Sequence, residues 1–226
     1  LEFRRVLFRS SSNPAAMAET LRRARIKLPR QNETISWSEL AQALAAEAQS
    51  LCVVNTTKDA RELFRLLKGF RPNGTFHLSA RMCPAHRQEK LVEIRRLLTP
   101  GSNEPCRLVS TQLIDAGVDV DFPLAFRALG PLDSIIQTAG RCNREGRHPE
   151  PCPVIVFRPV EIKLPPGAYA VATAKTEEFL ARNPDAPLHQ PETYWKYFGE
   201  LYKLIGPEKA DADKVFKFSR ICGSAL

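Results

Sequence analysis

The sequence has 226 residues, 43% of them hydrophobic, which is enough for one α/β domain and an appendage. No apolar run approaches the ~20 residues of a membrane helix, so we expect no membrane partner. The formal net charge of +8 (33 Lys and Arg against 25 Asp and Glu) favours a polyanion or a nucleotide as partner, although a solvated basic surface gives the same charge.

The first ten residues, "LEFRRVLFRS", carry charges within their apolar part and do not form a secretory signal. They resemble a translated vector or adapter sequence, and we expect residues 1–20 to be a non-native, disordered lead. Composition changes near residue 160, and a Pro-Pro-Gly run at 165–167 breaks the regular pattern. We therefore expect one folded domain over residues 21–160, followed by a linker and the start of an accessory helical region over residues 161–226.

Helical and strand patterns alternate from residue 36 onward. A helix is expected where Ser36 supplies an N-cap, and another where Pro84 occupies the first turn. Short continuous apolar runs between the helices are typical of strands buried on both faces. The alternation predicts an α/β three-layer sandwich with a mainly parallel sheet and a short helical C-terminal appendage. The expected helices span 36–49, 58–70, 84–98 and 133–144, and the expected strands span 51–55, 75–79, 106–111, 124–128 and 153–158.

The appendage is expected to hold an aromatic helix, "TYWKYFGELYKLIG". Its aromatic side chains are able to stack on nucleic-acid bases. We favour a core face instead, because Tyr194, Phe198, Leu201 and Ile205 recur with helical spacing.

Six cysteines stand at positions 52, 83, 106, 142, 152 and 222, and no pair has the C-x-x-C spacing of a zinc ribbon. Cys52 and Cys106 lie in apolar runs and are expected to be buried thiols. This usage indicates a reducing compartment, and we expect the cytoplasm. Cys83 and His86 have the spacing of two metal ligands, but no second pair accompanies them, so no metal site is predicted.

The carboxyl ends of parallel strands are where ligands bind such sheets, so the loops after residues 55, 79 and 111 form the predicted site. Ser110 and Thr111 end one buried strand, and Gly117 and Asp119 follow after a short turn. Hydroxyls, a flexible glycine and a carboxylate suit contacts to a nucleic-acid backbone, a ribose or a supporting arginine. Taken alone, Thr111 also fits a helix cap and Asp119 a turn.

The run "QTAGRCNREGR" places three arginines and a glutamine within one short stretch. At about 100° per residue, Gln137, Arg141 and Arg144 fall near 0°, 40° and −20°, which predicts one polar stripe on a helix. Cys142 falls on the opposite side, toward the sheet, and Gly140 leaves room for close approach. Guanidinium forks suit phosphate oxygens, whereas the same arginines also fit a solvated helix end that complements the helix dipole.

Four segments in this order resemble the motifs of superfamily 2 helicases. "VVNTTKDA" (53–60) is similar to their fourth motif, "STQLIDAGVD" (110–119) to the fifth, and "QTAGRCNREGR" (137–147) to the sixth, Q-x-x-G-R-x-x-R-x-G. "HLSARMCPAHR" (77–87) resembles the segment that follows the fourth motif. The residues of this segment, and those of "DSIIQTAGRCNREG", resemble one branch of superfamily 2 in particular, the CRISPR-associated helicase-nucleases of type I systems. The resemblance covers residues 21–160 well and the tail loosely.

The resemblance implies the second RecA-like domain of a two-domain motor, which binds ATP and Mg²⁺ in the cleft between its domains. It implies that Arg144 is the arginine finger and Arg141 its partner, and that Gln137 positions the γ-phosphate or holds the domains in register. The residues expected to bind ATP or to couple it to nucleic acid are Gly117, Asp119 and Gly140. Those expected to contact nucleic acid are Thr56, Ser79, Arg81, Arg87, Ser110 and Thr111, with Arg87 equally able to cap or solvate its helix.

The phosphate loop, the magnesium ligands and the His-Asp nuclease pair of the family are not found in this sequence, which contains no G-x-x-x-x-G-K-[ST] run. We therefore expect a C-terminal fragment, inactive as an ATPase alone, with the first RecA-like domain and a His-Asp nuclease domain upstream. The expected partners are single-stranded DNA and an RNA-guided surveillance complex in antiviral defence. Two alternatives stay open: a stand-alone nucleic-acid-binding or scaffold module, and a superfamily 2 helicase with another task such as RNA remodelling.

Overall fold

The computed structural model of the protein describes residues 13–115 and 118–205. The described chain divides into two compact units. One comprises residues 21–181, and the other combines residues 13–20 with residues 182–205. Each unit is described by itself below.

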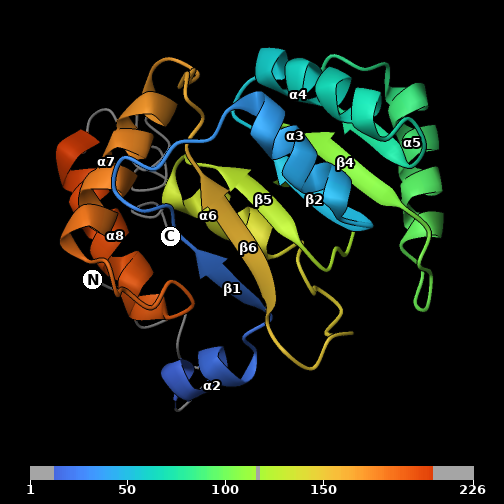
Figure 1. The fold of residues 1–226 in the computed structure, drawn as a ribbon. Helices are drawn as coiled ribbons and strands as arrows, with labels where there is room; N and C mark the ends of the chain where they lie inside the picture. The colour runs from blue at the N-terminus through green and yellow to red at the C-terminus, as the bar shows by residue number, and fades with distance from the viewer. Residues whose placement is uncertain (1–12, 116–117, 206–226) are drawn as a thin grey trace, which may run out of the picture. The chain divides into compact units, whose positions relative to one another are not determined.

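The larger unit is built on one six-stranded sheet in which every pair of neighbouring strands is parallel, in the order β1-β6-β5-β2-β4-β3 (Figure 1). This arrangement confirms the predicted fold class. All strands run the same way, so the sheet has one carboxyl edge and one amino edge. The strands are β1 (Ala24–Lys27), β2 (Gln49–Val53), β3 (Thr75–Leu78), β4 (Cys106–Ser110), β5 (Ala125–Ala128) and β6 (Cys152–Phe157).

Helices α3 (Trp37–Ala46) and α4 (Thr57–Phe70) cover one face of the sheet. The predicted N-cap of α3 is confirmed: the Ser36 side chain accepts from the Glu39 N–H (3.2 Å), and the Ser36 N–H donates to the Glu39 carboxylate (2.9 Å). Helix α4 buries an apolar stripe against the sheet. The core on this face includes Leu40, Leu44, Leu63 and Leu67 from the helices and Cys52, Val109 and Phe126 from the strands.

The opposite face is covered by α5 (Pro84–Leu97), the 3-10 helix η1 (Gln112–Asp115) and α6 (Leu132–Ala139). Pro84 begins α5 as predicted. Figure 1 shows α3 and α6 on opposite sides of the sheet, which gives the three expected layers. Both Cys52 and Cys106 are fully buried, which confirms that expectation.

Helix α6 ends earlier than the sequence predicts. It stops at Ala139 with Gly140 as its C-cap, so the helix expected over 133–144 is wrong in its last turn. The N–H groups of Arg141 and Cys142 donate to carbonyls three residues earlier, Thr138 O (2.9 Å) and Ala139 O (3.0 Å). This is the 3-10 hydrogen-bond pattern, so the chain leaves the α-helical conformation here. Arg141 and Arg144 therefore leave the helical stripe on which Gln137 remains.

Helix α7 (Ala168–Arg182) follows the Pro-Pro-Gly break and was not predicted. Strand β1 was not predicted either; it is a four-residue edge strand that pairs only with β6. Its two charged residues leave little apolar pattern to recognise.

The smaller unit contains α2 (Pro14–Thr20) and α8 (Pro191–Ile205). Residues 14–20 were expected to be disordered, but Asn13 caps a helix there, because its Oδ1 accepts from the Ala16 N–H (3.0 Å). Of the core face expected for the aromatic helix, Leu201 is buried, whereas Tyr194 and Phe198 are half-buried, and the side chain of Ile205 lies outside the described part of the structure. Thr193 and Tyr197 are buried instead, and the Tyr194 hydroxyl donates to Leu188 O.

Candidate nucleotide and nucleic-acid sites

The predicted site residues fall into two groups at opposite edges of the sheet. Thr56, Ser79 and Thr111 directly follow β2, β3 and β4, so they lie at the carboxyl edge. Arg141 and Arg144 lie beyond the end of α6, where the chain returns to the amino edge to begin β6. The two groups therefore form two candidate surfaces, one for nucleic acid and one for nucleotide phosphate.

Hydroxyl groups at the carboxyl edge have different surroundings. Thr56 caps α4, accepting from the Asp59 N–H (3.1 Å) and donating to Asp59 Oδ2 (2.7 Å). Ser110 is fully buried and donates to Leu78 O (3.0 Å), so its hydroxyl braces β4 against β3. Ser79 and Thr111 are also buried by their neighbours. Thr56 is the most accessible hydroxyl of this group.

Two predicted cations lie near the same edge. Arg81 is exposed in the loop between β3 and α5, and Arg87 is half-buried in the first turns of α5. Neither guanidinium makes a hydrogen bond or ion pair with a described residue. Both are thus available to an anion, and no capping contact of Arg87 accompanies its helix.

Residues 111–115 and 118–123, which we name the crossing segment, lie between the two edges. The segment leaves the carboxyl end of β4 and enters the amino end of β5, and β2 lies between these strands. Its apolar side chains Val118, Val120 and Phe122 are buried against the sheet, while Asp119 points out. The predicted coupling residue Gly117 lies outside the described residues.

The residues 140–147, which we name the arginine turn, are fastened to the end of the crossing segment. The Phe122 N–H donates to Arg141 O and the Asn143 N–H donates to Phe122 O, both at 3.0 Å. Asn143 adopts a left-handed conformation (φ 52°), and its side chain bonds the backbone N–H and carbonyl of His148 (3.0 and 2.9 Å). A non-local bridge and a left-handed asparagine thus fix the turn.

Two aspartates of the crossing segment hold the arginine turn. Asp119 pairs with Arg144 (Oδ1 to Nε, 3.1 Å), with 69% and 43% of the two side chains exposed. Asp121 is only 9% exposed and accepts from the backbone N–H groups of Arg144 (2.7 Å) and Glu145 (3.3 Å). It also lies 3.6 Å from Nε of Arg147. Asp121 was missed in the sequence, although the alternation Asp-Val-Asp places both carboxylates on one side of an extended chain.

The remaining predicted residues lie at the end of α6. Gln137 and Gly140 are exposed, and Arg141 is half-buried. A β-carbon at Gly140 would make only ordinary van der Waals contacts, 3.4 Å from Gln137 O and 3.7 Å from Ile136 O, so the packing there does not require glycine. The structure therefore brings Arg141 and Arg144 onto one turn beside α6, but not onto one helical face with Gln137.

A buried polar cluster, unsuspected from the sequence, supports the carboxyl edge. The fully buried Arg127 donates through Nη1 to Asn55 Oδ1 (2.8 Å) and Ala128 O (2.8 Å), and through Nη2 to the Tyr169 hydroxyl (2.9 Å). The Tyr169 hydroxyl donates in turn to Asn55 Oδ1 (2.8 Å), and Asn55 Nδ2 donates to Leu129 O (2.8 Å). The cluster links β2, β5 and α7 directly behind Thr56.

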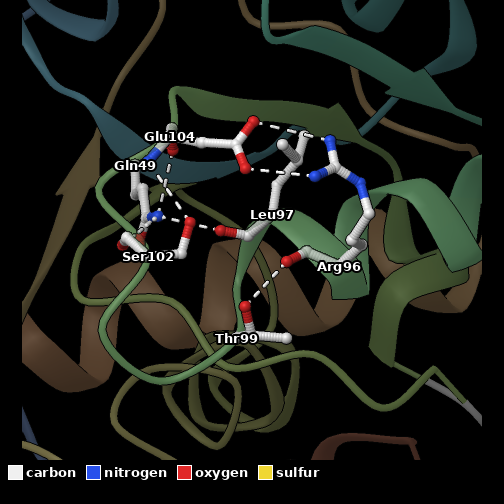
Figure 2. A network of polar contacts seen from close by, with 6 residues as sticks. All are labelled: Gln49, Arg96, Leu97, Thr99, Ser102 and Glu104. Atoms are coloured by element: carbon white, nitrogen blue, oxygen red, sulfur yellow. Dashed lines mark hydrogen bonds and ion pairs between the residues drawn. The ribbon is translucent and has the colours of Figure 1, made fainter.

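An open cavity of about 790 Å³ lies beside the arginine turn, between its Arg147 and the loop after α5. Figure 2 shows how that loop is held: Gln49 Nε2 donates to the carbonyls of Leu97 (3.2 Å), Ser102 (3.1 Å) and Glu104 (3.1 Å). Arg147 Nη1 donates to Leu98 O (2.8 Å). The loop and the arginine turn are therefore joined at the amino edge.

Chemically, this edge offers fixed positive charge. Burial raises the pKa of the Cys142 thiol to about 12, so this neighbour of Arg141 stays protonated at neutral pH.

Within residues 13–115 and 118–205, no group of three or more His, Cys, Asp or Glu side chains is arranged to hold a metal ion. None of the described helices is long and apolar enough to cross a membrane.

Comparison with protein families finds a match over residues 46–147 to the family described as "CRISPR-associated nuclease/helicase Cas3, C-terminal". A CRISPR-associated nuclease/helicase Cas3 of Haloferax volcanii is 51% identical over 67 residues, which cover 30% of this chain and 7% of that protein. The corresponding protein of Methanothermobacter thermautotrophicus is 29% identical over 99 residues, 44% of this chain and 11% of that protein.

Solved structures share the fold. The crystal structure of T. fusca Cas3-ATP superposes with a TM-score of 0.62 at 22% identity, covering 86% of this chain and 25% of that one. A chain of a structure described as "CRISPR RNA-guided surveillance complex, pre-nicking" superposes with a TM-score of 0.60 at 19% identity, covering 89% of this chain and 27% of that one. The chain thus spans about a quarter of these proteins. Over residues 46–147 the chain is thus similar to the C-terminal region of the CRISPR-associated nuclease/helicase Cas3 family, and it shares its fold with T. fusca Cas3.

Proposed function

We propose that residues 21–160 form the second motor domain of an ATP-dependent single-stranded DNA translocase that acts in CRISPR antiviral defence. The domain supplies the arginine finger, Arg144, and one wall of the DNA groove. The supporting observation is the crossing segment, which joins the hydroxyl-bearing edge to the arginine turn and carries the Asp119 that pairs with Arg144. A single stretch of chain thus contacts both candidate surfaces.

Arg144 stabilises the charge that develops on the γ-phosphate during its transfer to water. The Arg144 guanidinium pairs with Asp119, at 3.1 Å, in a solvent-exposed ion pair. Such a pair contributes only about 0–1 kcal/mol, so a phosphate with several charged oxygens competes with it successfully. Arg141, on the same turn, adds a second positive charge.

Release of Asp119 from Arg144 couples hydrolysis to movement on DNA. When the guanidinium turns to phosphate, Asp119 loses its ion-pair partner, and the change in charge at this position is felt by the crossing segment that carries Asp119. The far end of that segment is Thr111, at the carboxyl edge. The Thr56 hydroxyl and the backbone N–H groups there, with Arg81 and Arg87, contact DNA phosphates, which carry no sequence information. Translocation is therefore tolerant of sequence.

ATP and partners follow from the relatives. T. fusca Cas3 has been solved with ATP and with ADP, and a chain of similar fold occurs in an RNA-guided surveillance complex. We extend ATP use and recruitment by such a complex to this protein. We assign no magnesium ligand to the described residues. In this proposal Mg²⁺, the phosphate loop and the nuclease belong to preceding domains of a longer chain.

The test is Arg144→Ala in the full-length protein, with DNA-stimulated ATP hydrolysis as the measurement. The exposed side chain contributes little to stability, so the free energy of unfolding changes by less than about 1 kcal/mol. By analogy with other arginine fingers, kcat falls on the order of 10³-fold. Lysine restores little, because a point charge does not reproduce the planar fork.

Arg96→Ala is the matched control. Arg96 forms an exposed pair with Glu104, also at 3.1 Å, as Figure 2 shows, so its loss removes the same charge and the same kind of contact. We expect kcat to stay within about twofold. If kcat is unchanged in Arg144→Ala as well, with normal melting, then Arg144 is not a finger and the proposed mechanism is wrong.

A further inference from the structure

Besides its own three arginines, the arginine turn is contacted by the guanidinium of Arg23, which lies outside the helicase-like motifs. Arg23 directly precedes β1, the edge strand that pairs with β6. Its carbonyl accepts from the Cys152 N–H (3.0 Å) at the start of β6, just after the arginine turn. The side chain of Arg23 therefore begins at the amino edge, beside the candidate phosphate site.

The Arg23 guanidinium lies against Gly146. A β-carbon at Gly146 would overlap Nη1 of Arg23 and stand 3.1 Å from its Nη2. Gly146 also has a φ of 67°, a left-handed conformation that favours glycine. The Arg23 guanidinium thus packs on the backbone of the arginine turn at Gly146.

Charge compensation differs among the arginines of this edge. Arg144 is paired with Asp119, and Arg147 with Asp121 and the Leu98 carbonyl. The exposed Arg23 side chain has no hydrogen-bond or ion-pair partner among residues 13–115 and 118–205. A full positive charge is therefore held beside the arginine turn without an anion of the protein to neutralise it.

We infer that Arg23 is a third phosphate-contacting arginine of the nucleotide site, and that its ligand is the polyphosphate chain of a nucleoside triphosphate. The inference rests on the proposed function. A planar fork in contact with Gly146 presents its N–H donors at the arginine turn, which also carries Arg144. Arg144 acts on the transferred phosphate, whereas Arg23 contributes to ground-state binding.

A split between KM and kcat tests the assignment. In the full-length protein, Arg23→Ala raises the KM for ATP about tenfold, the worth of one charge-assisted hydrogen bond at a partly solvated site, and changes kcat less than threefold. Inorganic pyrophosphate, as a competitive inhibitor, loses affinity by a similar factor. Arg23→Lys keeps the charge and recovers part of the KM.

Arg25→Ala is the matched control, because Arg25 is exposed on the same strand and likewise has no partner among the described residues. Its KM for ATP stays within twofold. Equal KM values in Arg23→Ala and Arg25→Ala, with normal melting of both, overturn the assignment and make Arg23 a solvated surface residue. If Arg23→Ala does not fold, Arg23→Lys takes its place in the test. A lower melting temperature of Arg23→Lys, with KM for ATP and pyrophosphate affinity both unchanged in Arg23→Lys and in Arg25→Ala, then overturns the assignment.

Failure of this inference is distinguishable from failure of the proposed function. The finger is tested by kcat in Arg144→Ala, and the new contact by KM in Arg23→Ala. A large loss of kcat in Arg144→Ala with normal KM in Arg23→Ala removes only Arg23 from the site.

Discussion

Asp119 and Asp121 stand two residues apart, yet they contribute to the arginine turn in different ways. Asp119 forms a solvent-exposed ion pair with the Arg144 side chain. Asp121 is nearly buried, accepts hydrogen bonds from two backbone N–H groups and lies 3.6 Å from Nε of Arg147. Buried, charge-assisted bonds to backbone contribute more to stability than exposed ion pairs do. The same residue type therefore acts as an exchangeable partner at one position and as a structural brace at the other.

We predict that Asp121→Ala destabilises the protein by about 1–3 kcal/mol, because two backbone donors and an arginine lose their acceptor. Asp119→Ala removes only an exposed pair and costs less than about 1 kcal/mol. Urea unfolding of the two variants measures the difference. Equal losses would show that the turn is not held by Asp121.

Helix α7 meets the sheet through one hydroxyl at the Arg127 cluster. Tyr169→Phe leaves a buried guanidinium donor unpaired, and we predict a loss of about 1–3 kcal/mol in the free energy of unfolding. Tyr202→Phe is the control, since that ring is 57% exposed. Hydrogen exchange of α7 amides accelerates only in Tyr169→Phe. Equal stability of the two variants would contradict a structural role of the cluster.

Strand β3 introduces a pH dependence. His77 packs beside the ring of Phe64 (centroids 5.5 Å apart), and burial, with the nearby Arg61, lowers the pKa of its imidazole. The unfolded state therefore binds the proton more readily than the folded state does, and stability falls as the pH drops through the ordinary histidine pKa of about 6.5. We predict that His77→Gln flattens the stability profile between about pH 7 and pH 5. An unchanged profile would rule out this contribution.

Strands buried on both faces were predictable, whereas the edge strand β1 and the end of α6 were not. Runs such as "LCVVN" and "CRLVST" are apolar throughout, and a strand buried on both faces requires that pattern whatever its neighbours are. The end of α6 depends instead on the bridge between Phe122 and Cys142 and on the left-handed Asn143. Helical periodicity continues through Arg144 in the sequence, so only the fold reveals the exit. For the same reason the pairing of Asp119 with Arg144 was foreseen only as one of several partners, and Asp121, Arg23 and Arg127 were missed.

At the scale of the whole molecule, this region holds half of each proposed site. We predict that the isolated chain releases no phosphate from ATP above background, with or without single-stranded DNA, because arginines stabilise charge but do not activate water. A phosphate-release assay measures this. Turnover that persists on purification and changes in Arg144→Ala would contradict the division of the motor between two domains.

The same chain should bind single-stranded DNA weakly and without base preference, and its affinity should fall steeply with rising salt, since phosphate contacts release counterions. Fluorescence anisotropy with oligonucleotides of different sequence at several salt concentrations measures both properties. Tight, salt-insensitive binding to one sequence would favour a specific recognition module over a motor.

Because most of the described cysteines are buried, their alkylation rates report how often the surrounding structure opens. Cys83 is exposed, whereas Cys52, Cys106, Cys142 and Cys152 are buried. Cys142 is buried, and burial raises the pKa of its thiol to about 12, so iodoacetamide alkylates it very slowly in the closed protein. After Cys83 and Cys222 are replaced by serine, the alkylation rate of Cys142 measures how often the arginine turn separates from β6. A nucleotide that engages the turn slows that labelling, which makes occupancy of the site visible without any turnover of ATP.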